Sequence, residues 1–331
     1  MRIAWATDYE GIGNMLGHTV GNREGRAAAE SAGIEIDPDA EIAVHHCPPH
    51  CFKPLPGKVN ILWFAWEFPE FTPAELAGIK RAEIVFVTAK FLLGAVEQAA
   101  PEVPAFYVPQ GIRTDTFPFV KREKPVDRPF RFLWVGAPND RKGWRHVMAA
   151  WHSFMDSPDC ELYIKTTFAS DALPGGRHAG NITIDTARLS DAEMVAMYHN
   201  AHAFVFPSMG EGFGFTLGEA MATGLPCIYT PVTGLADLAD ARTGFPIAYT
   251  MKPCFDLDVL DGARQMMTAA WPDVRDLVRQ MRHVKRGYRY ARQIGRRAAK
   301  RIRQHFTWAQ SGRVLKSQLE VVKGILEEVR S

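Results

Sequence analysis

The chain has 331 residues, and its 39 Lys and Arg against 37 Asp and Glu leave a formal net charge of +2. A hydrophobic fraction of 47% with 23% charged residues is typical of folded proteins, which excludes a disordered chain or a fibre. At roughly 100–200 residues per domain, the length predicts two domains. No apolar run reaches the roughly 20 residues that span a bilayer, and the first residues do not resemble a cleavable leader. We therefore expect a cytoplasmic protein without an integral membrane segment.

Five cysteines are few and odd in number for a chain of this length, so we expect reduced thiols rather than a disulfide framework.

The near-neutral net charge conceals an asymmetry between the two parts of the chain. Residues 1–125 hold 12 Lys and Arg against 16 Asp and Glu, a net of −4, so the remainder of the chain carries +6. The two parts are expected to face different partners.

The first third of the chain alternates short apolar runs with stretches of helical length, which is typical of a parallel sheet covered by helices. Strands are predicted over residues 2–6, 41–45, 60–65, 83–87 and 105–108, and helices over 16–31, 72–81 and 90–99. Residues 109–129 contain four prolines among mixed charges, which is typical of a linker. This first part therefore reads as one doubly wound unit.

A second alternation of strands and helices follows the linker. Strands are predicted over residues 130–135, 161–165, 181–184, 203–206 and 227–230, and helices over 143–155, 191–200 and 216–223. From about residue 273 the pattern is helical only. The chain thus predicts an α/β protein with two Rossmann-like doubly wound domains, over residues 1–118 and 119–306. Ligands of open parallel sheets bind beyond the carboxyl ends of the strands, so the two domains are expected to face a cleft.

The helical C-terminal part is strongly basic. Between Asp276 and Glu320 there is no acidic residue, while arginines and lysines crowd residues 282–303. Apolar residues recur there at spacings of three and four, namely Val284, Tyr288, Ala291, Ile294, Ala298 and Ile302. This predicts one packed face and one solvated basic face. A surface that binds nucleic acid or acidic lipid is the alternative.

The motif with the most chemistry is the glycine-rich block at residues 207–226, which follows the strand predicted over 203–206 and opens a helix. Glycines at 210, 212 and 214 let backbone N–H groups approach a ligand closely, and the start of the helix favours an anion. Two carboxylates flank this turn, Glu211 in the loop and Glu219 on the helix. The two carboxylates can face one ligand. A pair of acids at this spacing is difficult to explain by packing alone.

This block resembles the E-x7-E segment of the retaining, nucleotide-sugar-dependent glycosyltransferases of family 4, whose fold is called GT-B. Residues 219–226, E-A-M-A-T-G-L-P, are similar to that family's E-A-M-A-x-G-x-P. The resemblance extends to further segments, namely 108–117 (the linker), 132–136 followed by Arg141-Lys142-Gly143, and Phe306-Thr307-Trp308, which begins the last helix in this family. In the family that helix crosses back to the first domain, so residues 307–331 are expected to pack there.

The resemblance implies transfer of a hexosyl or pentosyl group from a UDP or GDP sugar to a hydroxyl acceptor, without a metal or another cofactor. Lys142 and Arg141 would neutralise the donor diphosphate, Glu219 would hold the ribose hydroxyls, and Glu211 would bind the transferred sugar. The other implied donor-binding residues are Gly13, Gly136, Gly212, Phe213, Gly214, Phe215, Thr216 and Arg188. The family often has Arg in the place of Ala137, so Arg141 is expected to supply that charge.

The acceptor side is expected in the first domain, at the end of the strand over 60–65. Many relatives have a histidine there, and this chain has Trp66 and Glu67. An acid beside aromatic rings can bind acceptor hydroxyls or accept a proton, so Glu67 is also a catalytic candidate. A carboxylate that caps the next turn is the alternative. His46 ends the preceding strand and is expected to contact the acceptor.

Residues 45–51 combine C-x3-C with H-x3-H, which invites a zinc interpretation. Structural zinc sites draw on separated ligand pairs and no second pair is evident, so no metal is expected. Asp256-Leu257-Asp258 is expected to cap a helix rather than bind a metal. The acceptor stays open between a saccharide or lipid-linked glycan and a hydroxymethylated base in phage-type DNA. A peripheral membrane location, a non-catalytic nucleotide-sugar binding protein and any oligomeric state also stay open.

Overall fold

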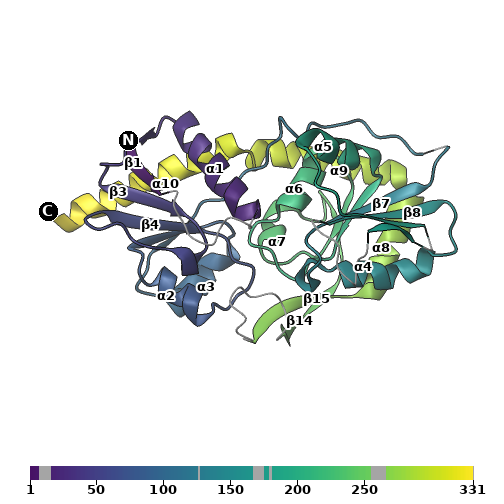
Figure 1. Ribbon diagram of the computed structural model, residues 1–331, viewed down its shortest axis with the longest axis horizontal. Coiled ribbons are helices and arrows are strands. Elements are labelled where there is room, and N and C mark those ends of the chain that lie inside the picture. Colours follow the sequence, from purple (N-terminus) through teal and green to yellow (C-terminus); the bar gives the residue numbers. More distant parts are fainter. Residues whose placement is uncertain (7–15, 126, 167–174, 179–180, 255–265, 331) are drawn as a thin grey trace. The chain divides into compact units, whose positions relative to one another are not determined.

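The computed structural model describes residues 1–6, 16–125, 127–166, 175–178, 181–254 and 266–330 (Figure 1). The chain divides into two compact units, Met1–Ile112 with His305–Ser331, and Arg113–Gln304. We call them unit 1 and unit 2. No helix in the described residues is long and apolar enough to cross a membrane.

Unit 1 is built on a parallel sheet with the strand order β2-β1-β3-β4-β5-β6. Its strands are β1 (Arg2–Ala6), β2 (Glu35–Ile36), β3 (Ile42–His46), β4 (Val59–Phe64), β5 (Ile84–Val87) and β6 (Ala105–Tyr107). Its helices are α1 (Leu16–Ser31), η1 (Pro49–Cys51), α2 (Pro73–Ile79), α3 (Phe91–Ala99) and α10 (Trp308–Arg330). β3 and β5 are buried throughout, as expected of strands covered on both faces.

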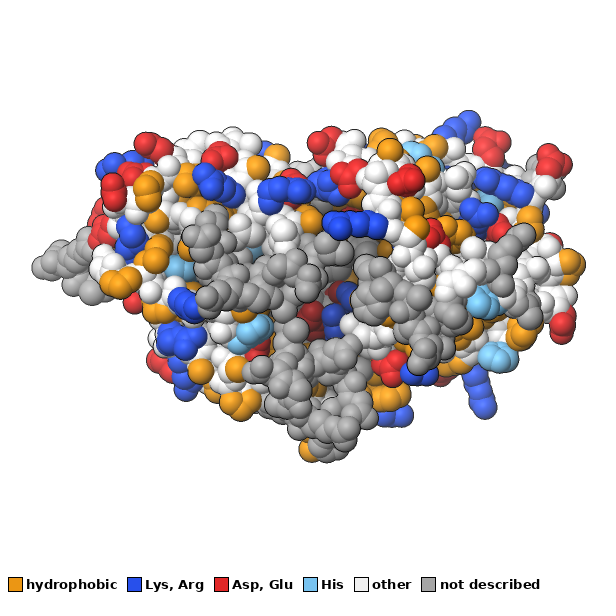
Figure 2. Space-filling view, viewed as in Figure 1, with side chains coloured by type: hydrophobic (Ala, Val, Ile, Leu, Met, Phe, Trp, Pro, Cys, Tyr) orange, Lys and Arg blue, Asp and Glu red, His pale blue; other side chains and the backbone are white. Residues whose placement is uncertain are grey.

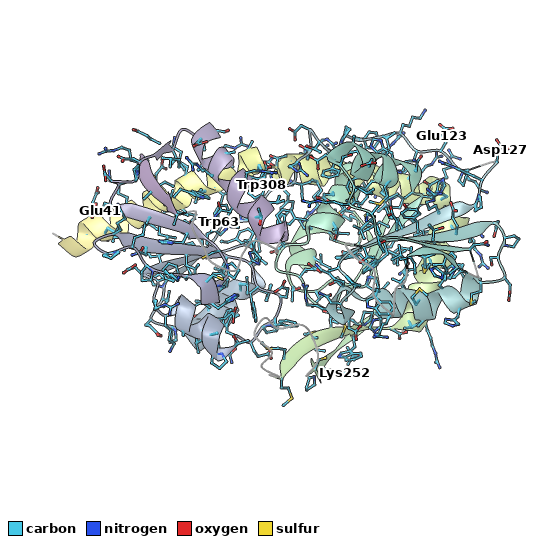
Figure 3. The ribbon with its side chains drawn as sticks, viewed as in Figure 1. Glu41, Trp63, Glu123, Asp127, Lys252 and Trp308 are labelled. Carbon is cyan, nitrogen blue, oxygen red and sulfur yellow. The ribbon has the colours of Figure 1, made fainter. Side chains whose placement is uncertain are left out.

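The C-terminal helix α10 returns to unit 1, as predicted. The Ile112 amide donates to the Phe306 carbonyl at 2.7 Å, and the Ser311 hydroxyl donates to the Pro109 carbonyl at 2.7 Å. Gly312 lets α10 approach α1 closely, because a Cβ atom there would lie 2.2 Å from the Ala28 carbonyl oxygen. Trp308, labelled in Figure 3, is buried at the start of this helix.

Unit 2 is built on a sheet with the strand order β13-β12-β11-β7-β8-β10-β9, in which β9 is antiparallel to β10 and the other pairs are parallel. Its strands are β7 (Phe130–Val135), β8 (Cys160–Lys165), β9 (Gly176–His178), β10 (Ile182–Asp185), β11 (Ala203–Phe206), β12 (Cys227–Tyr229) and β13 (Phe245–Pro246). Its helices are η2 (Asp140–Lys142), α4 (Trp144–Trp151), η3 (His152–Phe154), α5 (Asp191–Asn200), α6 (Phe215–Ala222), α7 (Gly234–Leu238), α8 (Val274–Arg286) and α9 (Tyr288–His305). Both units are thus doubly wound, as predicted.

Unit 2 also carries an antiparallel ribbon that the sequence pattern did not predict, β14 (Tyr249–Cys254) with β15 (Met267–Pro272). Every residue of β14 except Cys254 is exposed, so the strand lacks the alternation of buried and exposed residues by which strands are recognised. In contrast, the predicted apolar stripe of the basic region is confirmed. Its members, from Val284 to Ile302, are all buried, and α8 and α9 are separated at Gly287.

The sequence set the domain boundaries after residues 118 and 306, whereas the two units are divided after Ile112 and Gln304. The residues that follow Ile112 interact with unit 2. Arg113 forms two hydrogen bonds with Asp191, at 2.6 and 3.0 Å, and the Phe117 ring packs edge-on against Tyr198. Figure 2 shows one face of the molecule, on which basic and acidic side chains are interspersed, as expected for a net charge near zero.

Candidate functional site

The candidate site is formed by loops at the carboxyl edge of the unit 2 sheet. β7 and β11 are parallel neighbours, so the loops that follow them emerge at the same edge. The first loop contains η2 and ends at Gly143, whose φ of +75° lies in the left-handed region. A Cβ atom at Gly143 would lie 1.9 Å from the carbonyl oxygen of Pro207 in the second loop. Glycine is therefore required for the two loops to meet.

Where the loops meet, the Glu211 carboxylate is surrounded by polar partners. Lys142 Nζ lies 2.7 and 2.8 Å from its two oxygens, and Arg141 Nη1 lies 3.3 Å from Oε1. The Ser208 hydroxyl donates to the same Oε1 at 2.8 Å, and Arg141 also donates to the Gly210 carbonyl at 2.6 Å. Glu211 is 5% exposed and Arg141 8%. The structure therefore brings together Glu211, Lys142 and Arg141, as predicted.

The surroundings of Glu211 set its protonation state. Burial acts to raise the pKa of the carboxyl, but the charges of Lys142 and Arg141 and the hydrogen bonds from Lys142 and Ser208 outweigh burial. The pKa of Glu211 consequently lies below its ordinary value of 4.5. The carboxylate is ionised at neutral pH, and its charge is balanced by cations.

A third loop, after β12, fixes the backbone of Glu211. The Glu211 amide donates to the Thr233 hydroxyl at 2.8 Å, and its carbonyl accepts from the Gly234 amide at 2.9 Å. Thr233 has a φ of +47°, which is rare for a residue with a branched Cβ. Sequence reasoning missed Ser208 and Thr233. A serine two residues after β11 and a Thr-Gly pair in the loop after β12 were the available signals.

The loop from Glu211 leads into α6 through Gly214, whose φ is +101°. A Cβ atom at Gly214 would lie 2.4 Å from a Leu235 methyl group, so the turn is tightly packed on α7. Gly212 and Phe213 are buried, while Phe215 and Thr216 in the first turn of α6 are half-buried. The backbone N–H groups of a first helical turn have no partner within the helix, which suits an anion or a ligand hydroxyl.

Glu219 has different partners from Glu211. It lies on α6, is half-buried, and accepts a hydrogen bond from the Tyr198 hydroxyl at 3.0 Å. Burial raises the pKa of Glu219 to about 7, against the hydrogen bond from Tyr198 and the charge of Arg113. The two acids of the motif therefore differ in character, one ionised and bound to cations and the other close to half-protonated at neutral pH.

The remaining predicted donor residues follow neighbouring strands. Gly136 follows β7, and its amide donates to the Lys165 carbonyl at 3.0 Å. Arg188 is exposed in the loop after β10. That loop is held by Lys165, whose ammonium donates to the Asp185 carbonyl at 3.3 Å, and by Asp185, which accepts from Tyr163 at 2.7 Å. Gly13 lies outside the described residues.

The predicted acceptor residues of unit 1 differ in accessibility. His46 is fully buried, bonded to Gln110 at 3.0 Å, and burial lowers the pKa of its imidazole to about 3. Its ring packs edge-on against Trp63, a β4 residue labelled in Figure 3. Trp66 is 5% exposed, and its N–H donates to the Glu70 carbonyl at 2.7 Å. Glu67 is half-buried in the turn after β4 and thus stays the accessible acceptor candidate.

The side chains of the His- and Cys-containing segment at residues 45–51 do not converge. His45 bonds to Asn60 at 2.9 Å, His46 bonds to Gln110, and His50 bonds to Glu75 at 2.5 Å. In the described part of the chain, no group of three or more His, Cys, Asp or Glu side chains is arranged to hold a metal ion. Residues 256–258, predicted to cap a helix, lie outside the described residues.

Comparison with known proteins bears on the unit that carries Glu211. Residues 129–253 match the family model described as Glycosyl transferases group 1. No curated protein matches the sequence. The matched segment contains the Glu211 cluster, Gly136, Arg188 and Glu219.

Solved structures resemble the chain over most of its length. Sucrose-phosphate synthase from Thermosynechococcus elongatus is 16% identical, with 94% of this chain and 79% of that chain covered at a TM-score of 0.64. HepE from Anabaena, solved with UDP and glucose, is 12% identical, with 93% and 83% covered at 0.63. A glycosyltransferase from Rickettsia africae is 14% identical, with 97% and 84% covered at 0.62.

At these identities the likeness establishes the fold, which is GT-B. The fold and the match of residues 129–253 together support a glycosyltransferase. The matched segment lies in unit 2, which carries the Glu211 cluster at the carboxyl edge of its sheet.

Proposed function

We propose that the chain is a retaining glycosyltransferase of the family 4 type, which moves a hexosyl or pentosyl group from a nucleotide-diphosphate sugar to a hydroxyl acceptor. The observation that carries the proposal is the bonding of Glu211 to Lys142 and Arg141 at the entrance to a glycine-rich turn that opens α6. This arrangement lies within the segment matched by the glycosyl transferase family. UDP as the nucleotide is supported by the HepE complex.

The charges of the cluster account for donor binding. Glu211 forms ion pairs with both Lys142 and Arg141, so the two cations are held in place before a donor binds. A donor diphosphate would compete for these cations, and Glu211 would then accept hydrogen bonds from the sugar hydroxyls. Cations that are already oriented stabilise the charge that develops on a leaving diphosphate without reorganisation.

The nucleoside is assigned to the neighbouring residues. Glu219 in its ionised form would accept hydrogen bonds from both ribose hydroxyls. Residues 185–189, which include Arg188, would contact the base. Gly136 would leave room for the diphosphate at the end of β7. No metal ion is required in this scheme, because Lys142, Arg141 and the first turn of α6 supply the positive charge.

We assign a front-face mechanism, which needs no second catalytic carboxylate. The bond between the anomeric carbon and the diphosphate oxygen breaks, and the acceptor oxygen bonds to the same face of that carbon. Bonding on that same face retains the configuration of the carbon, and the acceptor proton passes to the departing diphosphate. Glu67 is the candidate for holding the acceptor hydroxyl. A saccharide is the first acceptor to test, since HepE was solved with glucose.

Two assays test this proposal in sequence. A panel of UDP and GDP sugars should contain one donor that raises the melting temperature, because a ligand of the folded state stabilises it. Slow hydrolysis of that donor should then fall about 100-fold or more in Glu211→Gln, since oriented polar groups of this kind contribute roughly 10²–10³ in rate. Glu123→Gln, on the exposed linker, is the control and should hydrolyse the donor like the wild type. Equal hydrolysis by Glu211→Gln and wild type, or no donor bound at all, would contradict the proposal.

A further inference from the structure

A second site lies on unit 2, where the linker meets α9. A pocket of about 330 Å³ is lined there by basic residues, Lys121 and Arg122 from the linker and Arg289, Arg292 and Arg296 from α9. The Arg122 guanidinium is buried and donates to the Ala201 carbonyl at 2.7 Å, so it is not available to a ligand. The guanidinium of Arg292 donates to the Arg122 carbonyl at 2.6 Å, which ties the helix to the linker. Basic side chains therefore converge on this pocket from two directions.

This pocket is separate from the Glu211 cluster. Its lining includes Gly224, which lies between α6 and the start of β12 and hence at the amino edge of the sheet. Glu211 follows β11 and lies at the carboxyl edge. The donor site and the basic pocket thus lie at opposite edges of one sheet, so a ligand of the pocket is not the sugar donor.

Acidic side chains do little to neutralise the pocket. Glu123 is the acidic residue of its lining, and it pairs with Lys121 at 3.6 Å on the exposed linker, where Figure 3 labels it. In the described part of the chain, no ion pair involves Arg289, Arg296 or Lys300. The residues that line the pocket therefore carry five positive charges against one negative charge.

The positive charge continues along α9 beyond the pocket. Residues at spacings of three and four share one helical face, and here they form a line of cations that we call the α9 stripe: Arg289, Arg292, Arg296, Lys300 and Arg303. At 1.5 Å per residue this line is about 21 Å long. Between Asp276 and Glu320 no acidic residue interrupts it.

The shape of this charge distribution selects the ligand. A linear array suits a linear polyanion better than one compact anion, which would contact only two or three of the cations. An acidic membrane is disfavoured because an interfacial helix inserts its apolar face into lipid, whereas the apolar face of α9 is buried in the protein.

We propose that the α9 stripe and the adjoining pocket bind the phosphate backbone of a nucleic acid, with contacts to phosphate rather than readout of base sequence. The proposal goes beyond the transferase reaction and does not depend on it. Affinity should therefore be independent of sequence and strongly dependent on salt, because bound phosphates release counterions. If all five stripe residues contact phosphate, the slope of log K against log salt should approach about −4.5.

Fluorescence anisotropy with a labelled 30-base-pair DNA duplex, at 50 to 200 mM salt, tests the proposal. The variant R289E/R296E/K300E alters exposed side chains and leaves the bond from Arg292 to the linker intact. We expect about a 100-fold or greater loss of affinity at 50 mM salt and a shallower salt slope. The matched control is R275E/R279E/R282E, which reverses as many exposed charges on α8 and should bind within about threefold of wild type.

Other outcomes overturn the proposal. Absence of wild-type binding at 50 mM salt would do so, as would equal losses in the α9 and α8 variants. Vesicles of phosphatidylcholine with 30% phosphatidylglycerol provide the second arm. Retention on these vesicles without binding to DNA would mean that the α9 stripe binds an acidic membrane and not a nucleic acid. Circular dichroism and donor-induced melting shifts of the α9 variant should match wild type, which separates a failure here from a failure of the proposed transferase activity.

Discussion

At the scale of single residues, the two acids of the glycine-rich block have opposite electrostatic situations. Glu211 is buried with Lys142 and Arg141, and these charges keep its pKa below the ordinary value. Glu219 is bonded to an uncharged phenol, and burial raises its pKa to about 7. In the proposed reaction the cations beside Glu211 would bind the diphosphate, and Glu211 would accept hydrogen bonds from the sugar. Glu219, once ionised, would accept hydrogen bonds from the ribose hydroxyls.

The raised pKa of Glu219 predicts a specific pH dependence. Between its ordinary value of 4.5 and about 7, the native protein holds more protons than the unfolded chain. The stability contributed by the protonated group is therefore present below pH 4.5 and is lost as the pH rises through about 7. Glu219→Gln does not titrate, so its free energy of unfolding should rise relative to that of the wild type by about 3 kcal/mol across this range, since each pKa unit corresponds to about 1.4 kcal/mol.

Urea unfolding at pH 4.5, 6 and 8 measures this difference, and donor binding provides a second readout. Wild-type affinity for the donor should increase as the pH rises through 7, because the ionised carboxylate accepts the ribose hydroxyls. The affinity of Glu219→Gln should change less. Parallel stability curves for the two proteins would show that the pKa of Glu219 is not raised.

The residue scale also shows what sequence can and cannot reveal about a site. Glu211, Lys142 and Arg141 were identified because they lie in motifs with characteristic spacing, and the structure joins them. Ser208 contacts Glu211 within one loop, but no motif marked it, and Thr233 contacts Glu211 from the loop after β12, which comes close only when β11 and β12 pair. His46 looked available at the end of a strand, but the packing of Gln110 and Trp63 around it could not be read from the chain.

At the scale of elements, the close contact between the η2 loop and the β11 loop controls the geometry of the site. Gly143 satisfies two requirements there, a left-handed backbone and the proximity of the Pro207 carbonyl. Gly57 has a similar φ of +72°, but a Cβ atom added there would meet no other atom within 4 Å, so this glycine separates the two effects.

Gly143→Ala should therefore destabilise the protein far more than Gly57→Ala. The control should lose about 1 kcal/mol, since a left-handed backbone costs an L-residue roughly 1–2 kcal/mol. Gly143→Ala should lose about 3 kcal/mol or more, because the Pro207 backbone must also move. Chemical denaturation measures both values. Equal losses in the two variants would mean that the loops can separate freely.

Strands were predicted correctly where an apolar run is buried on both faces of a sheet, and they were missed where the strand is exposed. The strands near the centre of each sheet, such as β4 and β11, consist mainly of buried apolar residues, and both were predicted. β14 is exposed on nearly every residue and contains Pro253, so its sequence resembles a loop. Its pairing with β15 depends on a distant segment, which local pattern does not reveal.

At the scale of the whole molecule, the chain builds two doubly wound units and returns to the first through α10. The return depends on local features that sequence did indicate, Phe306 and Trp308 at the start of the helix. The close approach of Gly312 to α1 was not predicted, because it depends on the backbone position of Ala28. The opposite charges of the two chain segments also have a structural counterpart, since the basic excess includes the α9 stripe in unit 2.

The account as a whole depends on a diphosphate binding beside Glu211, where Lys142 is the nearest cation. The most direct measurement is calorimetric titration of wild type, Lys142→Ala and Lys252→Ala with the nucleoside diphosphate selected by the melting panel. Lys252 is an exposed residue of β14, labelled in Figure 3, and serves as the control. We predict that Lys142→Ala binds about 10- to 100-fold more weakly, as loss of a charge-assisted hydrogen bond of roughly 1.5–3 kcal/mol implies, while Lys252→Ala matches wild type. Equal affinity of Lys142→Ala and wild type would contradict the assignment of this site.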